Sequence, residues 1–138
     1  MKYLHLIMNF KKELRIRIYN KFNGHCAYCG EKIQLKQMQI DHIIPQRNFE
    51  KCIKNNFRVP KFLSHLTLQD LNHKDNLLPS CMVCNNWKSS HDLELFRSEL
   101  SEQIDRLNKR SSNYRIAKKY HQIIECIKPI VFYFEKTR

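Results

Sequence analysis

Four of the six cysteines in the sequence form two pairs, each with two residues between its members. The pairs are Cys26 with Cys29 and Cys81 with Cys84. Four thiolates suit a tetrahedral ion of intermediate softness, and Zn²⁺ is the usual occupant of such a set. Redox-active or simply buried cysteines are the alternative, but two CxxC pairs in an intracellular chain favour a metal. We therefore expect these four sulfur atoms to hold a structural Zn²⁺.

The two cysteine pairs are far apart in the chain, because residues 30–80 lie between them. This gap is longer than that of a minimal zinc ribbon. A metal held at both ends closes the stretch as a loop and contributes on the order of 10 kcal/mol of binding free energy to folding. Gly30 follows the first pair directly, where a turn around a metal-bound sulfur often needs a positive φ. Cys52 and Cys126 have no partner at such spacing, and we interpret both as plain thiols.

Polar motifs accompany the cysteine pairs in a definite order. Residues 40–45 read IDHIIP, residues 75–80 read DNLLPS, and residues 85–88 read NNWK. Together with the CAYCG of the first pair, this order resembles the HNH endonuclease family, and in particular the subgroup whose ββα-metal motif is held by a four-cysteine zinc. The resemblance extends over about residues 23–88. Each motif alone is common, whereas four of them in this order are specific.

The resemblance implies a role for each polar residue of these motifs. His42 is the implied general base that takes a proton from water, and histidine as a residue type suits proton transfer near neutral pH. Asp41 and Asn85 are the implied ligands of one catalytic divalent ion, and their oxygen atoms suit Mg²⁺ or Mn²⁺. Asn76 corresponds to the middle asparagine of the family, which braces the loop that carries the base. Lys88 is expected to touch a phosphate from one helical turn beyond Asn85.

Ordinary structural roles are the alternative for the same residues. An Asp-His pair is common by chance, Asn76 could belong to a capped turn, and Asn85 could cap a helix. Their occurrence together, in this order and between these cysteines, favours the catalytic interpretation. Three more histidines, His65, His73 and His91, lie near enough in sequence to approach the site. We interpret them as solvated or structural, with His91 the best of them for a phosphate or metal contact.

The elements that must position these residues follow from apolar spacing and from turn signals. The pattern predicts helices at 10–22, 90–108 and 114–127, strands at 36–44 and 130–134, and a short helix at 64–71. Ser90 is the expected cap of the second helix, and residues 117, 120, 124 and 127 are the expected core face of the third. Residues 46–74 lack a clear period, and we predict an insertion or long loop there.

The expected fold is α+β, with a small ββα-metal (HNH) core stapled by a four-cysteine zinc site. Flanking helices and a C-terminal strand complete a single HNH domain over residues 1–138. Within it we expect a basic N-terminal helix up to residue 22, a zinc and HNH core at 23–88 with a basic insertion at about 46–74, and C-terminal helices and a strand at 89–138.

The charge of the chain indicates its partner. Lys and Arg number 25 against 13 Asp and Glu, a formal net charge of +12, and such an excess favours a polyanion. No apolar run approaches the roughly 20 residues that a membrane span needs, so nucleic acid is favoured over a membrane. The side chains expected to contact phosphates, without reading sequence, are Lys11, Lys12, Arg15, Arg17, Lys51, Lys54, Arg58 and Lys88.

These observations together predict a metal-dependent HNH endonuclease that nicks or cuts DNA, with RNA left open as a substrate. The alternative is a non-catalytic, zinc-stabilised nucleic-acid-binding or regulatory protein on the same scaffold. A phage, restriction, defence or mobile-element setting would suit a short HNH chain. A double-strand break would need a homodimer or two successive nicks. Because the sequence begins without a signal peptide, we expect a cytoplasmic protein.

Overall fold

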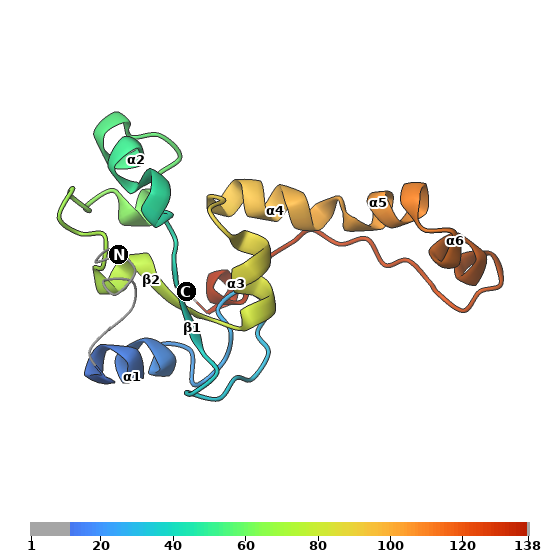
Figure 1. The fold of residues 1–138 in the computed structure, drawn as a ribbon, viewed down its shortest axis with the longest axis horizontal. Helices are drawn as coiled ribbons and strands as arrows, with labels where there is room; N and C mark the ends of the chain where they lie inside the picture. Colours follow the sequence, from blue (N-terminus) through green and yellow to red (C-terminus); the bar gives the residue numbers. More distant parts are fainter. Residues whose placement is uncertain (1–11, 138) are drawn as a thin grey trace, which may run out of the picture.

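A two-stranded antiparallel sheet forms the centre of the computed structural model, which describes residues 12–137. Strand β1 (Gln39–His42) pairs with strand β2 (Leu77–Ser80). Helix α3 (Met82–Lys88) follows β2 after one intervening residue and contacts β1. The three elements form a ββα unit (Figure 1). The α+β class expected from the sequence is therefore confirmed.

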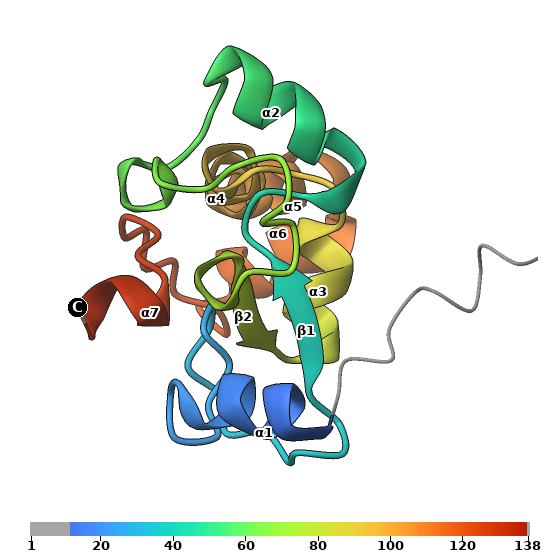
Figure 2. The same cartoon turned by 90° about the vertical axis from the view of Figure 1, so that its left-hand side faces the viewer.

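Six further α-helices belong to the described chain. They are α1 (Lys12–Asn20), α2 (Phe49–Asn55), α4 (Leu93–Ser101), α5 (Gln103–Arg110), α6 (Ser112–Lys119) and α7 (Tyr133–Lys136). Helices α1 and α2 lie at opposite ends of the strands (Figure 2), whereas α5 and α6 project from the body as an arm (Figure 1). Within residues 12–137, none of the helices has the length and apolar character needed to cross a membrane.

The hydrophobic core includes the first cysteine pair and the C-terminal segment. Tyr28 packs edge to face against three phenylalanine rings, at centroid distances of 5.4 Å to Phe96, 5.3 Å to Phe132 and 6.2 Å to Phe134. The amide of Phe134 also donates a hydrogen bond to the carbonyl of Ala27 (2.8 Å). Burial of each such ring contributes roughly 1.5–3 kcal/mol. The chain end thus holds the turn that carries Cys26 and its neighbours.

Two glycines frame that turn, and both have positive φ angles. Gly24 has a φ of 76° and Gly30 a φ of 77°. A Cβ on Gly24 would lie 2.7 Å from the Tyr19 hydroxyl, and one on Gly30 would lie 2.8 Å from the ring of Tyr133. Glycine is required at both positions because the backbone conformation and the space exclude a side chain. The positive φ expected at Gly30 is confirmed.

Residues 46–74 have more secondary structure than the predicted long loop. Helix α2 lies in this segment, with Phe49 and Cys52 buried one turn apart on its inner face. Short 3-10 helices occur at Gln46–Asn48 and Lys61–Leu63. The helix predicted at 64–71 is wrong, because these residues form turns and irregular backbone rather than a helix. Side chains bond the backbone locally there and compete with helix formation.

The helix predicted at 90–108 exists in two pieces. Helices α4 and α5 divide at Glu102. The helical region begins at Leu93, and its N-cap is Asp92 rather than the predicted Ser90. The Asp92 carboxylate accepts hydrogen bonds from two backbone N–H groups of the first turn, each at 3.0 Å. A carboxylate in this position satisfies amides that have no partner within the helix.

The helix predicted at 114–127 is wrong in extent, because α6 ends at Lys119. His121 then adopts a φ of 58°, which is incompatible with a continuing α-helix. Three of the residues predicted for its core face are instead exposed: Tyr120 by 71%, Ile124 by 88% and Ile127 by 77%. Beyond α6 the chain returns along the arm through polar contacts, such as the 2.6 Å hydrogen bond from Asn108 to Glu125.

The strand predicted at 130–134 is also wrong. Residues 130–132 have no regular secondary structure and belong to neither strand of the sheet, and α7 begins at Tyr133. Phe132 and Phe134 are each 1% exposed, so the apolar character that suggested a strand is real. These apolar side chains pack on the turn of the first cysteine pair, and the segment does not join a sheet.

Candidate active site and metal centre

The four cysteines of the two pairs come together, with their sulfur atoms all within 4.8 Å of one another. Cys29 Sγ lies 4.0 Å from Cys81 Sγ. Four sulfur atoms at about 2.3 Å from a tetrahedral Zn²⁺ would be roughly 3.8 Å apart, so the group fits this ion. Backbone amides support the sulfur atoms, as the N–H of Cys84 does toward Cys81 Sγ (3.4 Å). The group could therefore hold a metal such as zinc.

The electrostatics of the four thiols also favours a cation. The hydrogen bond between Cys84 and Cys26 lowers the pKa of Cys26 to about 4 and raises the pKa of Cys84. Burial raises the pKa of Cys29 to about 11. One thiolate therefore suppresses ionisation of its neighbours. A divalent ion at the centre would favour the deprotonated form of all four ligands.

Asp41 is buried in β1 and is held by two side chains. The hydroxyl of Tyr28 donates a hydrogen bond to Asp41 Oδ2. Lys88 Nζ lies 3.0 Å from the same oxygen and also donates to the carbonyl of His42 (2.8 Å). Burial raises the pKa of Asp41, while Lys88 and Tyr28 act in the opposite direction. The carboxylate therefore has a fixed orientation inside the protein.

Lys88 differs from its expected role. Its side chain is fully buried, and its ammonium group contacts Asp41 and the backbone of β1. It does not face solvent, where a nucleic acid would have to approach. A long, charged side chain is so seldom buried without a partner that this ion pair explains its position. In this arrangement Lys88 positions Asp41 rather than a phosphate.

His42 lies at the end of β1, half-buried, and its Nε2 is 2.9 Å from Asn72 Oδ1. An amide oxygen only accepts hydrogen bonds, so Nε2 carries the proton and Nδ1 has a lone pair in the neutral ring. Sequence reasoning missed Asn72. It lies in a polar turn whose composition resembles any surface loop, so no signal in the sequence identifies it.

Asn76 is fully buried and connects the two segments on either side of the site. Its Oδ1 accepts from the Ile44 amide (2.8 Å), and its Nδ2 donates to the Leu71 carbonyl (2.9 Å). Its own carbonyl accepts from the amide of Ile43 (2.8 Å). These bonds tie the loop after β1 to the turn before β2. Asn76 thus lies where a residue that braces the loop after His42 would lie.

One cavity of about 310 Å³ brings the proposed site residues together. Asp41, His42 and Asn85 all line it, and Arg47 and Ser89 are among its other lining residues. Asn85 reaches it from the middle of α3, a helix that is anchored by the second cysteine pair. A carboxylate, an amide and an imidazole side chain therefore line one space. His91 does not line this cavity, and its Nδ1 is buried without a hydrogen-bond partner among the described residues.

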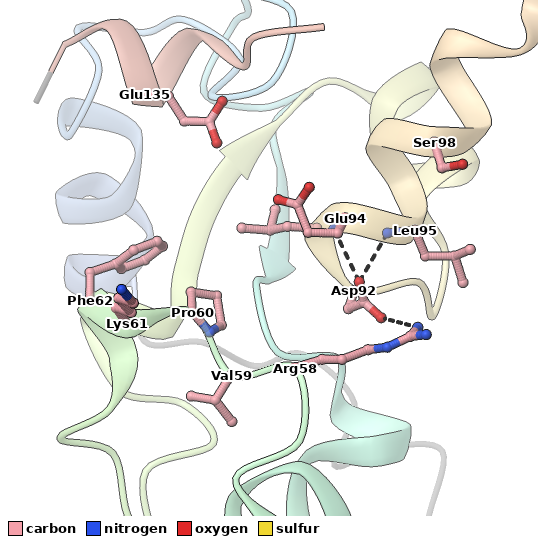
Figure 3. Close-up of a pocket in the computed structure, with 11 residues that line it drawn as sticks. Arg58, Val59, Pro60, Lys61, Phe62, Asp92, Glu94, Leu95, Ser98 and Glu135 are labelled. Carbon is pink, nitrogen blue, oxygen red and sulfur yellow. Dashed lines mark hydrogen bonds and ion pairs between the residues drawn. The ribbon is translucent and has the colours of Figure 1, made fainter.

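A larger cavity lies elsewhere, and it contains none of these site residues. It has a volume of about 570 Å³ and lies between the segment at residues 58–62 and α4. Figure 3 shows Arg58 pointing across to Asp92 at its edge, where an ion pair of 2.9 Å joins them. The smaller cavity is the candidate site, because it brings together the carboxylate, amide and imidazole side chains that the sequence motifs identified.

The basic side chains predicted to contact phosphates fall into different environments. Lys12, Arg17 and Lys51 are exposed. Arg15 instead donates to the carbonyls of Leu35 (3.0 Å) and Met38, which fixes α1 on the turn before β1. Two others have acidic partners, since Lys54 pairs with Glu50 and Arg58 with Asp92. Lys11 lies outside the described residues.

Comparison with known proteins gives one structural similarity. No family model and no curated protein matches the chain. Among solved structures, it is similar to the Type II-C Cas9 enzyme from Actinomyces naeslundii, with 23% sequence identity and a TM-score of 0.44. The match covers 77% of this chain and 10% of the Cas9 chain. The similarity therefore concerns a small part of that enzyme.

Proposed function

We propose that the protein is a metal-dependent endonuclease of the HNH type, which hydrolyses phosphodiester bonds in DNA. The observation that carries this proposal is the single cavity lined by Asp41, His42 and Asn85. It lies at a ββα unit that the four-cysteine group joins to the N-terminal turn. A base and two oxygen ligands around one space are what metal-assisted hydrolysis of a phosphodiester requires.

His42 would activate the attacking water through Nδ1. The contact with Asn72 assigns the proton to Nε2, so Nδ1 is the unprotonated nitrogen of the neutral ring. After proton transfer the ring keeps its Nε2–H bond to Asn72 and therefore its orientation. Asn76 would fix the backbone just beyond His42 through its bonds to Ile44. Such positioning keeps the base in one geometry throughout the reaction.

Asp41 and Asn85 would hold one Mg²⁺ or Mn²⁺. When bound, the ion would neutralise charge on the scissile phosphate and on the leaving oxygen. The donor set fits, because both residues offer hard oxygen atoms. Tyr28 and Lys88 both engage Oδ2 of Asp41, so Oδ1 is the oxygen available to the ion. Phosphate and water would supply the remaining ligands.

Exposed basic residues would guide the nucleic acid to this site. The net charge of +12 favours a polyanion, and the exposed Lys12, Arg17 and Lys51 suit contacts with phosphates. Contacts of this kind position a duplex without reading its sequence. We expect binding to weaken steeply as salt concentration rises, because each phosphate contact releases counterions.

Nicking of supercoiled plasmid in Mg²⁺ or Mn²⁺ tests the proposal. The wild type should produce relaxed or linear DNA, and both His42→Ala and EDTA should abolish the product. His121→Asn is the matched control, because His121 is exposed at the end of α6 and asparagine tolerates its positive φ. Zinc content and circular dichroism should stay unchanged in both variants. Equal cleavage by wild type and His42→Ala would reject the assigned base.

A non-catalytic nucleic-acid-binding protein is the second candidate. The observation in its favour is the buried ion pair between Asp41 and Lys88, which partly neutralises the carboxylate proposed as a metal ligand. Absence of cleavage by the wild type, together with tight and salt-sensitive DNA binding, would support this candidate instead.

A further inference from the structure

Three side chains that can ligate metals meet outside the two centres described above. They are His65, His73 and Asp75, and their ligand atoms all lie within 4.8 Å of one another. His65 Nε2 is 3.0 Å from Asp75 Oδ2, and His73 Nδ1 is 3.7 Å from the same oxygen. None of the three belongs to the cysteine group or lines the cavity of Asp41. We call this group the His–His–Asp cluster.

The backbone around the cluster is built to hold it. His65 lies between two buried anchors, Leu63 and Leu66. A tight turn then reverses the chain, because the carboxylate of Asp70 accepts from both the amide (2.8 Å) and the hydroxyl (2.7 Å) of Thr67. The returning chain reaches a 3-10 helix, Lys74–Asn76. The cluster is therefore fixed by buried residues on both of its sides.

Two acceptor atoms lie close together in the cluster. The backbone N–H of Asp75 donates to His73 Nδ1 (3.2 Å), so this nitrogen carries a lone pair and no proton. The carboxylate oxygen of Asp75, 3.7 Å away, is an acceptor as well. A cation at the cluster would meet unprotonated ligand atoms from both residues, in exchange for the hydrogen bond that His73 Nδ1 accepts. Side-chain exposures of 52% for His65, 34% for His73 and 42% for Asp75 leave the cluster open to ions from solvent.

The distances fit a single ion. Metal bonds to histidine nitrogen and carboxylate oxygen are about 2.0–2.2 Å long, so neighbouring ligand atoms lie roughly 3–3.7 Å apart. The separations of 3.0 Å and 3.7 Å within the cluster lie in this range. Two imidazoles and one carboxylate suit Zn²⁺ or a similar divalent transition metal, whereas Mg²⁺ prefers oxygen ligands.

We propose that His65, His73 and Asp75 form a second transition-metal site, with water at the fourth position of the ion. The site is independent of the proposed nuclease activity. It is nevertheless next to the candidate active site along the chain, because Asn72, whose amide contacts His42, directly precedes His73. A bound ion would fix the turn from which Asn72 reaches the base.

Calorimetric titration of the intact protein with Zn²⁺ tests the site, after its cysteine group has been loaded with one equivalent. The wild type should bind one further equivalent, and millimolar Mg²⁺ should not displace it. His65→Ala and Asp75→Asn should each weaken this second binding at least tenfold. His121→Asn should bind as the wild type does. Zinc retained at the cysteines and unchanged circular dichroism would show that the variants are folded.

Ring nitrogen resonances give a second measurement that does not depend on variants. In the wild type, the ¹⁵N signals of His65 and His73 should shift together as the second equivalent is added, while the signal of His121 stays in place. Absence of a second equivalent would overturn the proposal. So would equal affinity in His65→Ala, or a shift confined to other histidines such as His42 or His91.

Discussion

The hydroxyl of Tyr28 donates a hydrogen bond to Asp41 Oδ2, and this bond joins the cysteine group to the candidate active site. Tyr28 lies between Cys26 and Cys29 in the sequence. Asp41 is the carboxylate proposed to hold the catalytic ion. The turn organised around the first cysteine pair therefore reaches directly into the active site, and a structural metal at that turn would influence how Asp41 is presented.

Removal of the Tyr28 hydroxyl should lower the free energy of unfolding without loss of zinc. Tyr28→Phe keeps the ring contacts with Phe96 and Phe132 but removes a buried bond to a charged group, worth about 1.5–3 kcal/mol. Urea unfolding at neutral pH measures the change. Tyr114→Phe is the control, because its bond to Glu125 lies on the arm and should contribute less. An equal effect of both substitutions would contradict a special role for Tyr28.

Lys88→Met should destabilise the protein strongly, by roughly 3–5 kcal/mol, because it leaves the Asp41 carboxylate buried without its cation. Adding Asp41→Asn should recover part of that loss, since the amide needs no countercharge. A double-mutant cycle from urea unfolding measures the coupling. Lys54→Met removes an exposed ion pair with Glu50 and should cost less than about 1 kcal/mol. Simple additivity of the two buried substitutions would show that the pair is not coupled.

Loss of one cysteine ligand should remove the structural metal and lower the unfolding temperature. Cys29→Ser should lose zinc that survives treatment with a chelating resin, because three thiolates hold the ion much less tightly. Cys126→Ser is the matched control, since Cys126 is exposed and does not belong to the four-sulfur group. Elemental analysis and thermal unfolding give the two readouts. Unchanged zinc in Cys29→Ser would contradict the four-cysteine assignment.

Asp92 should make stability depend on pH in the acid range. Burial raises the pKa of Asp92, but bonds from the α4 amides and from Arg58 outweigh it and hold this pKa below its usual value. A lowered native pKa contributes stability that is present above the unfolded value of about 3.9 and is lost as pH falls through the native value. Asp92→Ala should therefore cost about 1 kcal/mol at pH 7 and much less at pH 3. Urea unfolding at both pH values checks this, and a cost independent of pH would reject the explanation.

Features that depend on residues close together in the sequence could be predicted from residue types and their spacing. The two CxxC pairs predicted the cysteine group, and β1 (Gln39–His42) lies within the strand predicted at 36–44. The motifs also identified Asp41, His42 and Asn85, which line one cavity. Whether these residues act as proposed is for the cleavage experiment to decide.

Contacts between distant segments could not be predicted in the same way. Asn72 meets His42 across thirty positions and Lys88 meets Asp41 across forty-seven, and no periodic pattern marks either residue. The apolar pattern at 114–127 predicted a helix with a buried face, yet α6 ends at Lys119, so most of that face is exposed on the arm. Periodicity shows that a segment could form a helix, but only the packing partner decides whether it does.

The projecting arm of α5 and α6 has a hydrodynamic consequence (Figure 1). A compact chain of 138 residues has a radius of gyration of roughly 14 Å. Mass displaced from the body increases this radius and the frictional coefficient. The protein should therefore sediment more slowly, and elute earlier from a sizing column, than a sphere of its 16.8 kDa. An early elution volume alone would then reflect an elongated monomer as readily as a dimer, and sedimentation equilibrium, which is insensitive to shape, distinguishes the two.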